Sequence, residues 1–520
     1  MKEGRKTRRC AARVVALGAL LLVASQAAWQ EPLHAASPSS IFEGEVRASS
    51  DRTMRQLYAA RNYAPLWSEG SRLSDAAEDV LARLETADAD GLDPRDYQVK
   101  RLRAAFDDAA SSPKDLARAE VQLSRAFLKY ARDLRRSRAA DMVYVDPALI
   151  PTAPSPGTAL DRASGVGPKS ASMQEALGTH PLYEQLREAY VRWQDRWGDL
   201  PQTRISEATP LRAGARGERV EDLRVRLGLP AGDVFDAATT AAVRAFQSGH
   251  GLTATGIADA ATIDILNSGA RSFAAKLRLN LERARALPTA ANRYVLVDAA
   301  AQRLWMYQDG RPVDSMKVIV GRVTEPTPML AAYIRSAVLN PYWNVPPDLV
   351  QTRVAPKVLS QGLNHLRAER YQVLSDWSDN AKPVDAKTID WRAVARGEVE
   401  VPMRQLPGPK NSMGNMKFMF PNQFGVYLHD TPDKRLFGAA DRKQSAGCVR
   451  LEDARRLGRW LFGRVPSTKS NAPEQSVPLK SPVPVYITYL TVAPTPDGIA
   501  LRDDIYGRDG EGGTRLAGRR

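Results

Sequence analysis

Cysteine is nearly absent from the sequence, since the 520 residues include only Cys10 and Cys448. Cys10 lies in an N-terminal segment with the features of a removable leader, so the processed chain would hold one thiol and no internal disulfide. An unpaired thiol in an oxidising compartment is a liability, because it can be oxidised or cross-linked. Cys448 is therefore a candidate reactive cysteine. The alternative is an inert cysteine that packs as a small apolar residue.

Histidine is also scarce. The chain has five histidines, and only His365 and His429 fall in the C-terminal region that is rich in predicted strands. Neither belongs to a paired metal-ligand motif. The sequence thus disfavours a metal-dependent enzyme, and it predicts no metal and no cofactor.

Long apolar runs are lacking as well. Residues 14–24 form an apolar stretch of eleven residues, well short of the ~20 needed to span a bilayer. Basic residues precede this stretch and small residues follow it, which is typical of a secretory signal peptide. We expect residues 1–27 to be a signal peptide (a retained anchor is the alternative). The processed chain should be exported to the periplasm and have no membrane span.

Acidic residues are outnumbered, with 59 Asp and Glu against 74 Lys and Arg, for a net charge of +15. Residues 1–27 hold six basic residues and one acidic residue, which leaves +10 on the processed chain. A basic excess favours an acidic partner. For an exported protein, cell-wall peptides and membrane surfaces are such partners, and nucleic acid is not expected. A generally basic surface without a specific partner is equally compatible.

The patterning divides the chain into regions of different secondary structure. Residues 40–200 are predicted to be a helical scaffold domain, with Ser74 as a helix cap and a loop at residues 146–172. Strands dominate residues 290–507, interrupted by an insert at about 350–405 that we expect to act as a lid. Residues 508–520 are predicted to be a disordered tail. The fold class is therefore multidomain α+β.

Residues 208–268 form a compact unit with apolar helical faces and glycine-marked turns, among them Gly214, Gly217 and Gly251. The pattern Ala-Val-x-x-Phe-Gln at residues 242–247 belongs to one of these helices. The whole unit resembles the three-helix peptidoglycan-binding-type domain. The alternative is a module that packs against its neighbours and binds nothing.

The strand-rich region holds the residues that suggest chemistry. His429 follows a predicted strand at residues 424–428, and Cys448 lies in the motif Ser-Ala-Gly-Cys-Val-Arg at residues 445–450. A nucleophilic thiol needs a base that takes its proton and later returns one to the leaving group, and imidazole suits both steps. Amides around Gly447 and Cys448 could stabilise a tetrahedral oxyanion. Arg450 would lower the pKa of the thiol and could hold an acidic substrate.

These motifs resemble the catalytic signature of the L,D-transpeptidases. The resemblance rests on His-Asp-Thr-Pro at residues 429–432, on Arg442, and on residues 445–450. Segments at residues 339–346 and 407–414 are similar to the long Gram-negative subgroup, which joins a helical scaffold, a peptidoglycan-binding-type domain and a capping insert. Short members often carry histidine where this chain has Ala446, so His429 is the one base candidate.

The resemblance implies a specific reaction and roles for further residues. Cys448 attacks the third residue of a donor stem peptide, D-alanine leaves, and an amine of a second stem resolves the thioester as a 3→3 cross-link. The Asp430 carbonyl is expected to orient His429, and Tyr427 either lies in the site or only packs. Ser445, Gly447 and Arg450 are candidates for oxyanion or substrate binding.

Two alternatives remain open at this stage. The same site could act as a wall-peptide hydrolase or attach another amine, such as a lipoprotein lysine. A non-catalytic peptidoglycan-binding protein with a degenerate enzyme domain is the alternative of another class. The intact set of His429, Ser445, Gly447, Cys448 and Arg450 argues against degeneracy.

Overall fold

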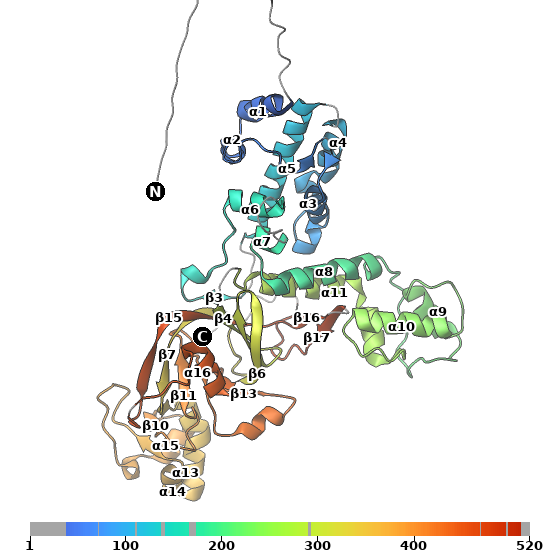
Figure 1. The fold of residues 1–520 in the computed structure, drawn as a ribbon. Coiled ribbons are helices and arrows are strands. Elements are labelled where there is room, and N and C mark those ends of the chain that lie inside the picture. The colour runs from blue at the N-terminus through green and yellow to red at the C-terminus, as the bar shows by residue number, and fades with distance from the viewer. Residues whose placement is uncertain are drawn as a thin grey trace, which may run out of the picture.

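The computed structural model describes residues 38–70, 72–109, 112–136, 141–165, 173–289, 293–468, 470–495 and 498–510. The predicted signal peptide and most of the predicted tail lie outside these residues. Figure 1 shows a helical part above a strand-rich part, with the long helices α8 and α11 lying side by side between them. The predicted multidomain α+β class is confirmed. No helix among the described residues is long and apolar enough to cross a membrane.

The N-terminal part is a bundle of helices around one apolar core. Its elements are α1 (Pro38–Ala48), α2 (Arg52–Ala59), β1 (Ser68–Glu69), β2 (Arg72–Leu73), α3 (Asp75–Glu85), η1 (Ala87–Asp90), η2 (Pro94–Tyr97), α4 (Val99–Ala109), α5 (Pro113–Leu134), η3 (Pro147–Leu149), α6 (Pro156–Ala163), α7 (Met173–Leu177) and α8 (Pro181–Trp197). Ser74 caps α3 as predicted, by accepting the Ala77 N–H. The predicted loop at residues 146–172 is wrong in part, because Ser155 caps a helix there, α6, with Pro156 at its first position.

The next unit contains α9 (Glu218–Arg226), α10 (Ala237–Gly249) and the first turns of α11 (Ala260–Arg285). A break at Gly269, where φ is 80°, divides α11. This backbone conformation is one that residues with a Cβ rarely adopt, which favours glycine here. The turns before Gly269 complete the small three-helix unit, and the turns after it run along α8.

The strand-rich part is a ten-stranded sheet that closes on itself. Its strands are β3 (Val143–Tyr144), β4 (Arg293–Asp298), β5 (Arg303–Gln308), β6 (Arg311–Gly321), β7 (Leu330–Leu339), β11 (Met416–Met419), β12 (Leu428–His429), β13 (Lys443–Ser445), β14 (Val449–Leu451) and β15 (Gln475–Thr488). The sheet closes because β11 pairs with both β12 and β7. In sequence, η6 (Lys434–Gly438) follows β12, and α16 (Ala454–Phe462) follows β14.

An insert with its own small core interrupts the sheet between β7 and β11. Its elements are β8 (Trp343–Asn344), α12 (Pro347–Leu349), η4 (Val350–Val354), α13 (Ala355–Gln361), α14 (Asn364–Ala368), β9 (Tyr371–Val373), η5 (Ala386–Thr388), α15 (Trp391–Arg396) and β10 (Met403–Gln405). Trp391 is buried in the insert core and Tyr371 packs against it, whereas Trp377 is exposed. β8, β10 and β9 form a small separate sheet, so the insert begins and ends on the paired strands β8 and β10.

The C-terminal end departs from the sequence-based prediction. The hairpin of β16 (Val492–Thr495) and β17 (Gly498–Leu501) falls in residues 290–507, which the sequence predicts to be the L,D-transpeptidase catalytic domain, but Val492 and Ile499 are buried in the core of the helical part. The predicted disordered tail begins at residue 508, yet Arg508 donates to the Thr327 carbonyl and Asp509 pairs with Arg283. The ordered chain therefore continues past the predicted boundary.

Candidate active site

His429 and Cys448 come from adjacent parallel strands. In the register of β12 and β14, Leu428 lies opposite Val449 and His429 lies opposite Arg450. Cys448 directly precedes β14, and the Val449 N–H donates to the Tyr427 carbonyl at 3.2 Å. The parallel pairing thus brings the two motifs together across eighteen residues of intervening chain.

The predicted strand before His429 is shorter than expected. Residues 424–427 are not in a strand, and β12 consists of Leu428 and His429 alone. The Asn422 side chain accepts from the Phe424 and Val426 N–H groups and donates to the Val426 carbonyl. These bonds compete with strand pairing and fold the segment into a turn.

The turn that carries Cys448 is held by hydrogen bonds on three sides. Gly447 has a φ of 96°, which favours glycine. The Ser445 hydroxyl donates to the Cys448 carbonyl at 2.5 Å, and the Thr327 hydroxyl donates to the Gly447 carbonyl at 2.8 Å. The Arg322 N–H donates to the Ser445 carbonyl at 3.0 Å. Ser445 is thus engaged in shaping the turn.

His429 is a buried, neutral base in this geometry. Its Nδ1 lies 2.6 Å from the Asp430 carbonyl oxygen. A carbonyl can only accept, so Nδ1 carries the proton and Nε2 has a free lone pair. Burial, aided by the positive charge of Arg450, lowers the pKa of His429 to about 3. The imidazole is therefore available to take a proton at neutral pH.

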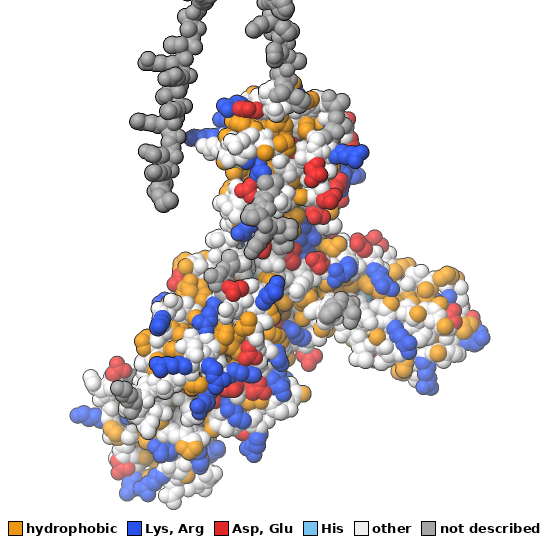
Figure 2. Space-filling view, in the orientation of Figure 1, with side chains coloured by type: hydrophobic (Ala, Val, Ile, Leu, Met, Phe, Trp, Pro, Cys, Tyr) orange, Lys and Arg blue, Asp and Glu red, His pale blue; other side chains and the backbone are white. Residues whose placement is uncertain are grey.

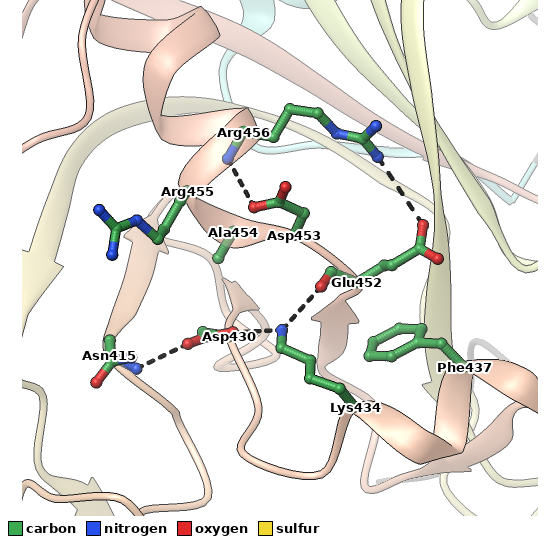
Figure 3. A pocket seen from close by; sticks show the side chains of 9 residues that line it. All are labelled: Asn415, Asp430, Lys434, Phe437, Glu452, Asp453, Ala454, Arg455 and Arg456. Atoms are coloured by element: carbon green, nitrogen blue, oxygen red, sulfur yellow. Dashed lines mark hydrogen bonds and ion pairs between the residues drawn. The ribbon is translucent and has the colours of Figure 1, made fainter.

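Asp430 contacts the imidazole through its backbone carbonyl, while its carboxylate is held elsewhere. The Asn415 N–H donates to this carboxylate at 3.0 Å, and the Lys434 ammonium donates to it at 2.6 Å. Lys434 also donates to the Leu451 and Glu452 carbonyls, as Figure 3 shows for Glu452. Asp430 is thereby fixed between η6 and the end of β14.

A cavity of about 630 Å³ lies beside Asp430 and Lys434 rather than beside the thiol. The residues that line it are Asn415, Asp430, Lys434, Phe437, Glu452, Asp453, Ala454, Arg455 and Arg456 (Figure 3). Cys448 and His429 are not part of this lining. The cavity therefore borders the residues that hold the Asp430 carboxylate, and Cys448 and His429 lie outside it.

Cys448 is protonated at rest. Burial raises the pKa of the thiol above its ordinary value, while the Tyr427 N–H, Arg450 and the Tyr427 side chain act in the opposite direction. As the sequence predicts, the charge of Arg450 acts to lower the pKa of Cys448. The effect of burial is larger, so the pKa is raised overall. The thiol lies 3.9 Å from the Gly425 carbonyl oxygen, to which it donates.

Tyr427 contacts both reacting groups. Its ring centroid lies 5.8 Å from that of His429. Burial and the neighbouring Cys448 raise the pKa of the Tyr427 phenol, so the hydroxyl is a donor at neutral pH. Of the two readings that the sequence left open, the geometry favours a place in the site.

Arg450 is a cation with an unsatisfied donor beside the thiol. Its Nε is buried and has no hydrogen-bond partner in the part of the chain that the structure describes. Burial and the like charge of Arg353, from the insert, lower the pKa of Arg450, and Arg322 acts in the same direction. An anionic group entering the site would find a donor already in place.

Several residues of the site were not found from the sequence. Thr327 and Lys434 carry no motif signal, because their roles depend on contacts with distant segments. Gly414 did lie in a quoted motif, and its function is steric: a Cβ there would lie 2.5 Å from the Asp430 side chain. Among the described residues, no three His, Cys, Asp or Glu side chains are grouped as a metal site.

Three segments of the chain match known protein families. Residues 52–189 match the family described as "Scaffold domain", residues 222–266 match "Putative peptidoglycan binding domain", and residues 292–485 match "L,D-transpeptidase catalytic domain". A curated Haemophilus influenzae protein described as "Putative L,D-transpeptidase" is 31% identical over 241 residues, or 45% of this chain. The match covers 48% of that protein, so the chain spans about half the length of this relative.

Solved structures of L,D-transpeptidases overlap part of the chain. One from Mycobacterium smegmatis is 13% identical and covers 39% of this chain and 60% of its own, with a TM-score of 0.20. A mutant enzyme from Enterococcus faecium is 15% identical and covers 39% and 52%, with a TM-score of 0.19. TM-scores of this size do not establish a shared overall fold.

The family matches define a multidomain protein in which a transpeptidase domain is combined with a domain of the peptidoglycan-binding type. The strand-rich region of the chain, residues 292–485, is similar to L,D-transpeptidase catalytic domains.

Proposed function

We propose that the chain is an exported peptidoglycan L,D-transpeptidase that forms 3→3 cross-links through a thioester on Cys448. One observation carries this proposal: His429 is fixed as the Nδ1–H tautomer by the Asp430 carbonyl, on the strand adjacent to the only described thiol. This arrangement leaves Nε2 as the proton acceptor.

The first half-reaction acylates the enzyme. Cys448 turns from the Gly425 carbonyl, transfers its proton to His429 Nε2 and attacks the carbonyl carbon of the third stem residue. The oxyanion receives the Cys448 N–H, which donates to no atom in the described chain. The imidazolium then protonates the amine of the terminal D-alanine, the C–N bond breaks, and a thioester remains.

Arg450 is proposed to bind a carboxylate of the donor stem. The terminal D-alanine carries its carboxylate one residue beyond the scissile bond, and Arg450 lies next to both Cys448 and His429. The buried Nε without a partner supports this assignment, because a buried donor is costly until a ligand satisfies it. Figure 2 shows other Lys and Arg side chains spread over the visible face of the strand-rich part, which suits acidic stem peptides.

The second half-reaction transfers the acyl group. His429, neutral again after D-alanine departs, accepts a proton from the side-chain amine of diaminopimelate on a second stem. The amine attacks the thioester, the C–S bond breaks, and the thiolate regains its proton from the imidazolium. No cofactor takes part in either half-reaction. The small unit around α9 and α10 is proposed to hold the enzyme on peptidoglycan.

The test is analysis of muropeptides after the purified protein has been incubated with disaccharide-tetrapeptides. The expected product is a dimer that has lost one D-alanine and carries a 3→3 linkage, located by tandem mass spectrometry. Release of D-alanine with only tripeptide product would instead identify a hydrolase. No consumption of the donor would contradict any transpeptidase function, and a Cys448→Ala variant provides the blank.

A further inference from the structure

The C-terminal segment after β17 reaches the loop that supports the catalytic turn. The Tyr506 hydroxyl donates to the Gly321 carbonyl at 2.7 Å and accepts the Thr327 N–H at 3.4 Å. The Arg508 guanidinium donates to the Thr327 carbonyl at 3.1 Å. Both backbone polar groups of Thr327 are therefore satisfied by residues that lie about 180 positions later in the chain.

The Thr327 side chain connects the C-terminal segment to the turn that carries Cys448. It is fully buried, and its hydroxyl accepts the Gly321 N–H at 2.8 Å while donating to the Gly447 carbonyl at 2.8 Å. Tyr506, Gly321 and Thr327 thus form a closed cycle of hydrogen bonds, and the Thr327 hydroxyl links this cycle to Gly447. A buried cycle with every group satisfied is rigid.

The hydrogen bond from the Thr327 hydroxyl to the Gly447 carbonyl determines the direction of the oxyanion donor. The Gly447 carbonyl and the Cys448 N–H belong to one planar trans peptide group, so they point in opposite directions. Holding the carbonyl against Thr327 directs the N–H away from Thr327, and this N–H donates to no atom in the described part of the chain. A donor of this kind is effective only if it is aimed before charge develops.

The segment is itself fixed to the helical part of the molecule. Asp509 pairs with Arg283 at 2.7 Å and with Lys276 at 3.4 Å, both on α11. The Tyr506 ring stacks on Tyr489, with centroids 5.2 Å apart. Tyr506 is thus held by the Tyr489 ring, and the segment that carries it is tied to α11 through Asp509.

We propose that Thr327 and Tyr506 are positioning residues that aim the Cys448 N–H at the oxyanion, so that the C-terminal segment is part of the catalytic apparatus. This inference rests on the proposed acyl-transfer function of Cys448. It predicts that loss of the Thr327 hydroxyl slows acyl transfer at Cys448 and leaves other chemistry of the thiol intact.

The test compares two reactions of the same thiol in the full-length protein. A carbapenem acylates through a tetrahedral oxyanion, whereas iodoacetamide alkylates sulfur without forming one. Thr327→Val keeps the side-chain shape and removes the hydroxyl, and Thr327→Ser retains the hydroxyl as the matched control. We expect acylation by the carbapenem to fall by roughly 10- to 100-fold in Thr327→Val, with alkylation unchanged and Thr327→Ser close to wild type.

Tyr506→Phe provides a second variant if Thr327→Val does not fold, because it retains the stacked ring and removes only the hydroxyl. It should show a smaller loss of the same kind, in acylation and not in alkylation. Equal losses in both reactions, or wild-type acylation in both variants, would overturn the positioning role. A wild-type protein that neither reacts with the carbapenem nor forms cross-links would instead remove the proposed function, and the inference with it.

Discussion

At the scale of single residues, Cys448 and His429 form a pair in which neither group is charged at rest. Burial raises the pKa of the thiol and lowers that of the imidazole to about 3. Many reactive cysteines are instead kept as thiolates by a charged neighbour. In the proposed mechanism the proton moves to His429 only when a substrate carbonyl is attacked, so the lone thiol would be protected from oxidation between turnovers.

This resting state predicts how the alkylation of Cys448 by iodoacetamide depends on pH. The thiolate fraction should rise continuously with pH and level off only above the ordinary thiol pKa of 9.0. A thiolate–imidazolium pair would give a rate that is already constant in the neutral range. The measurement is the second-order rate constant across the pH range, and a neutral plateau would contradict the account.

The sequence places Cys448 and His429 in local motifs, and the structure brings the segments that carry them together through the pairing of β12 and β14. The signal for Cys448 is a rare residue type beside a glycine turn. The signal for His429 is a rare residue type at the end of a predicted strand. Thr327 could not be predicted, since its role exists only when the segments at 321, 447 and 506 are folded together. Asp430 combines both cases. The family resemblance implies that its carbonyl orients His429, but nothing in the sequence indicates the partners of its carboxylate.

At the scale of elements, the insert is the clearest candidate for controlling water. Its core is separate from that of the sheet, and the positive charge of Arg353 on η4 helps to lower the pKa of Arg450. Because Val345 donates to the Met403 carbonyl, residues 346–402 can be replaced by an Asn-Gly turn between adjacent strands.

We expect this excision to raise the ratio of hydrolysed to cross-linked product, since water would reach the thioester more easily. Muropeptide analysis gives the ratio directly. Alkylation of Cys448 by iodoacetamide serves as the control for an intact site. An unchanged ratio in a folded variant would count against a role of the insert as a lid.

The C-terminal hairpin shows why element patterns do not determine domain membership. Strand signals near residue 495 were visible in the sequence, but their packing partners were not, because alternation says nothing about which core receives the apolar face. The fold places this hairpin on α8 and α11. The buried Asn280 side chain accepts the Thr491 and Val492 N–H groups at 2.8 and 3.2 Å.

Asn280→Ala should therefore destabilise the protein by about 2–6 kcal/mol, because two buried N–H groups lose their acceptor at roughly 1–3 kcal/mol each. Urea denaturation followed by fluorescence measures the change. Ser272→Ala, on the exposed side of α11, is the matched control and should be nearly neutral. An equally small effect of both substitutions would show that Asn280 does not hold the hairpin.

At the scale of the whole molecule, buried histidines make the fold sensitive to acid. Burial lowers the pKa values of His180, His250 and His429 to about 3 from the ordinary 6.5. Below pH 6.5 the unfolded chain binds protons at these positions and the folded chain does not. Stability is thus complete above pH 6.5 and is lost as the pH falls toward 3.

The expected result is a urea midpoint that declines steadily over this range. In a His180→Gln variant the decline should be shallower, because one of the three groups no longer titrates. The comparison is between slopes, so a lower midpoint of the variant at neutral pH does not affect it. A midpoint independent of pH in the wild type would contradict neutral burial of these rings.

The central claim is that Cys448 is the nucleophile of an acyl-transfer reaction, and intact-mass spectrometry with a carbapenem tests it most directly. The strained ring offers an electrophilic carbonyl to the thiol and leaves a stable thioester. We expect one adduct on the wild-type protein, located at Cys448 by peptide mapping, and none on a folded Cys448→Ala variant. An adduct that persists on Cys448→Ala would show that another residue reacts and would contradict the assignment.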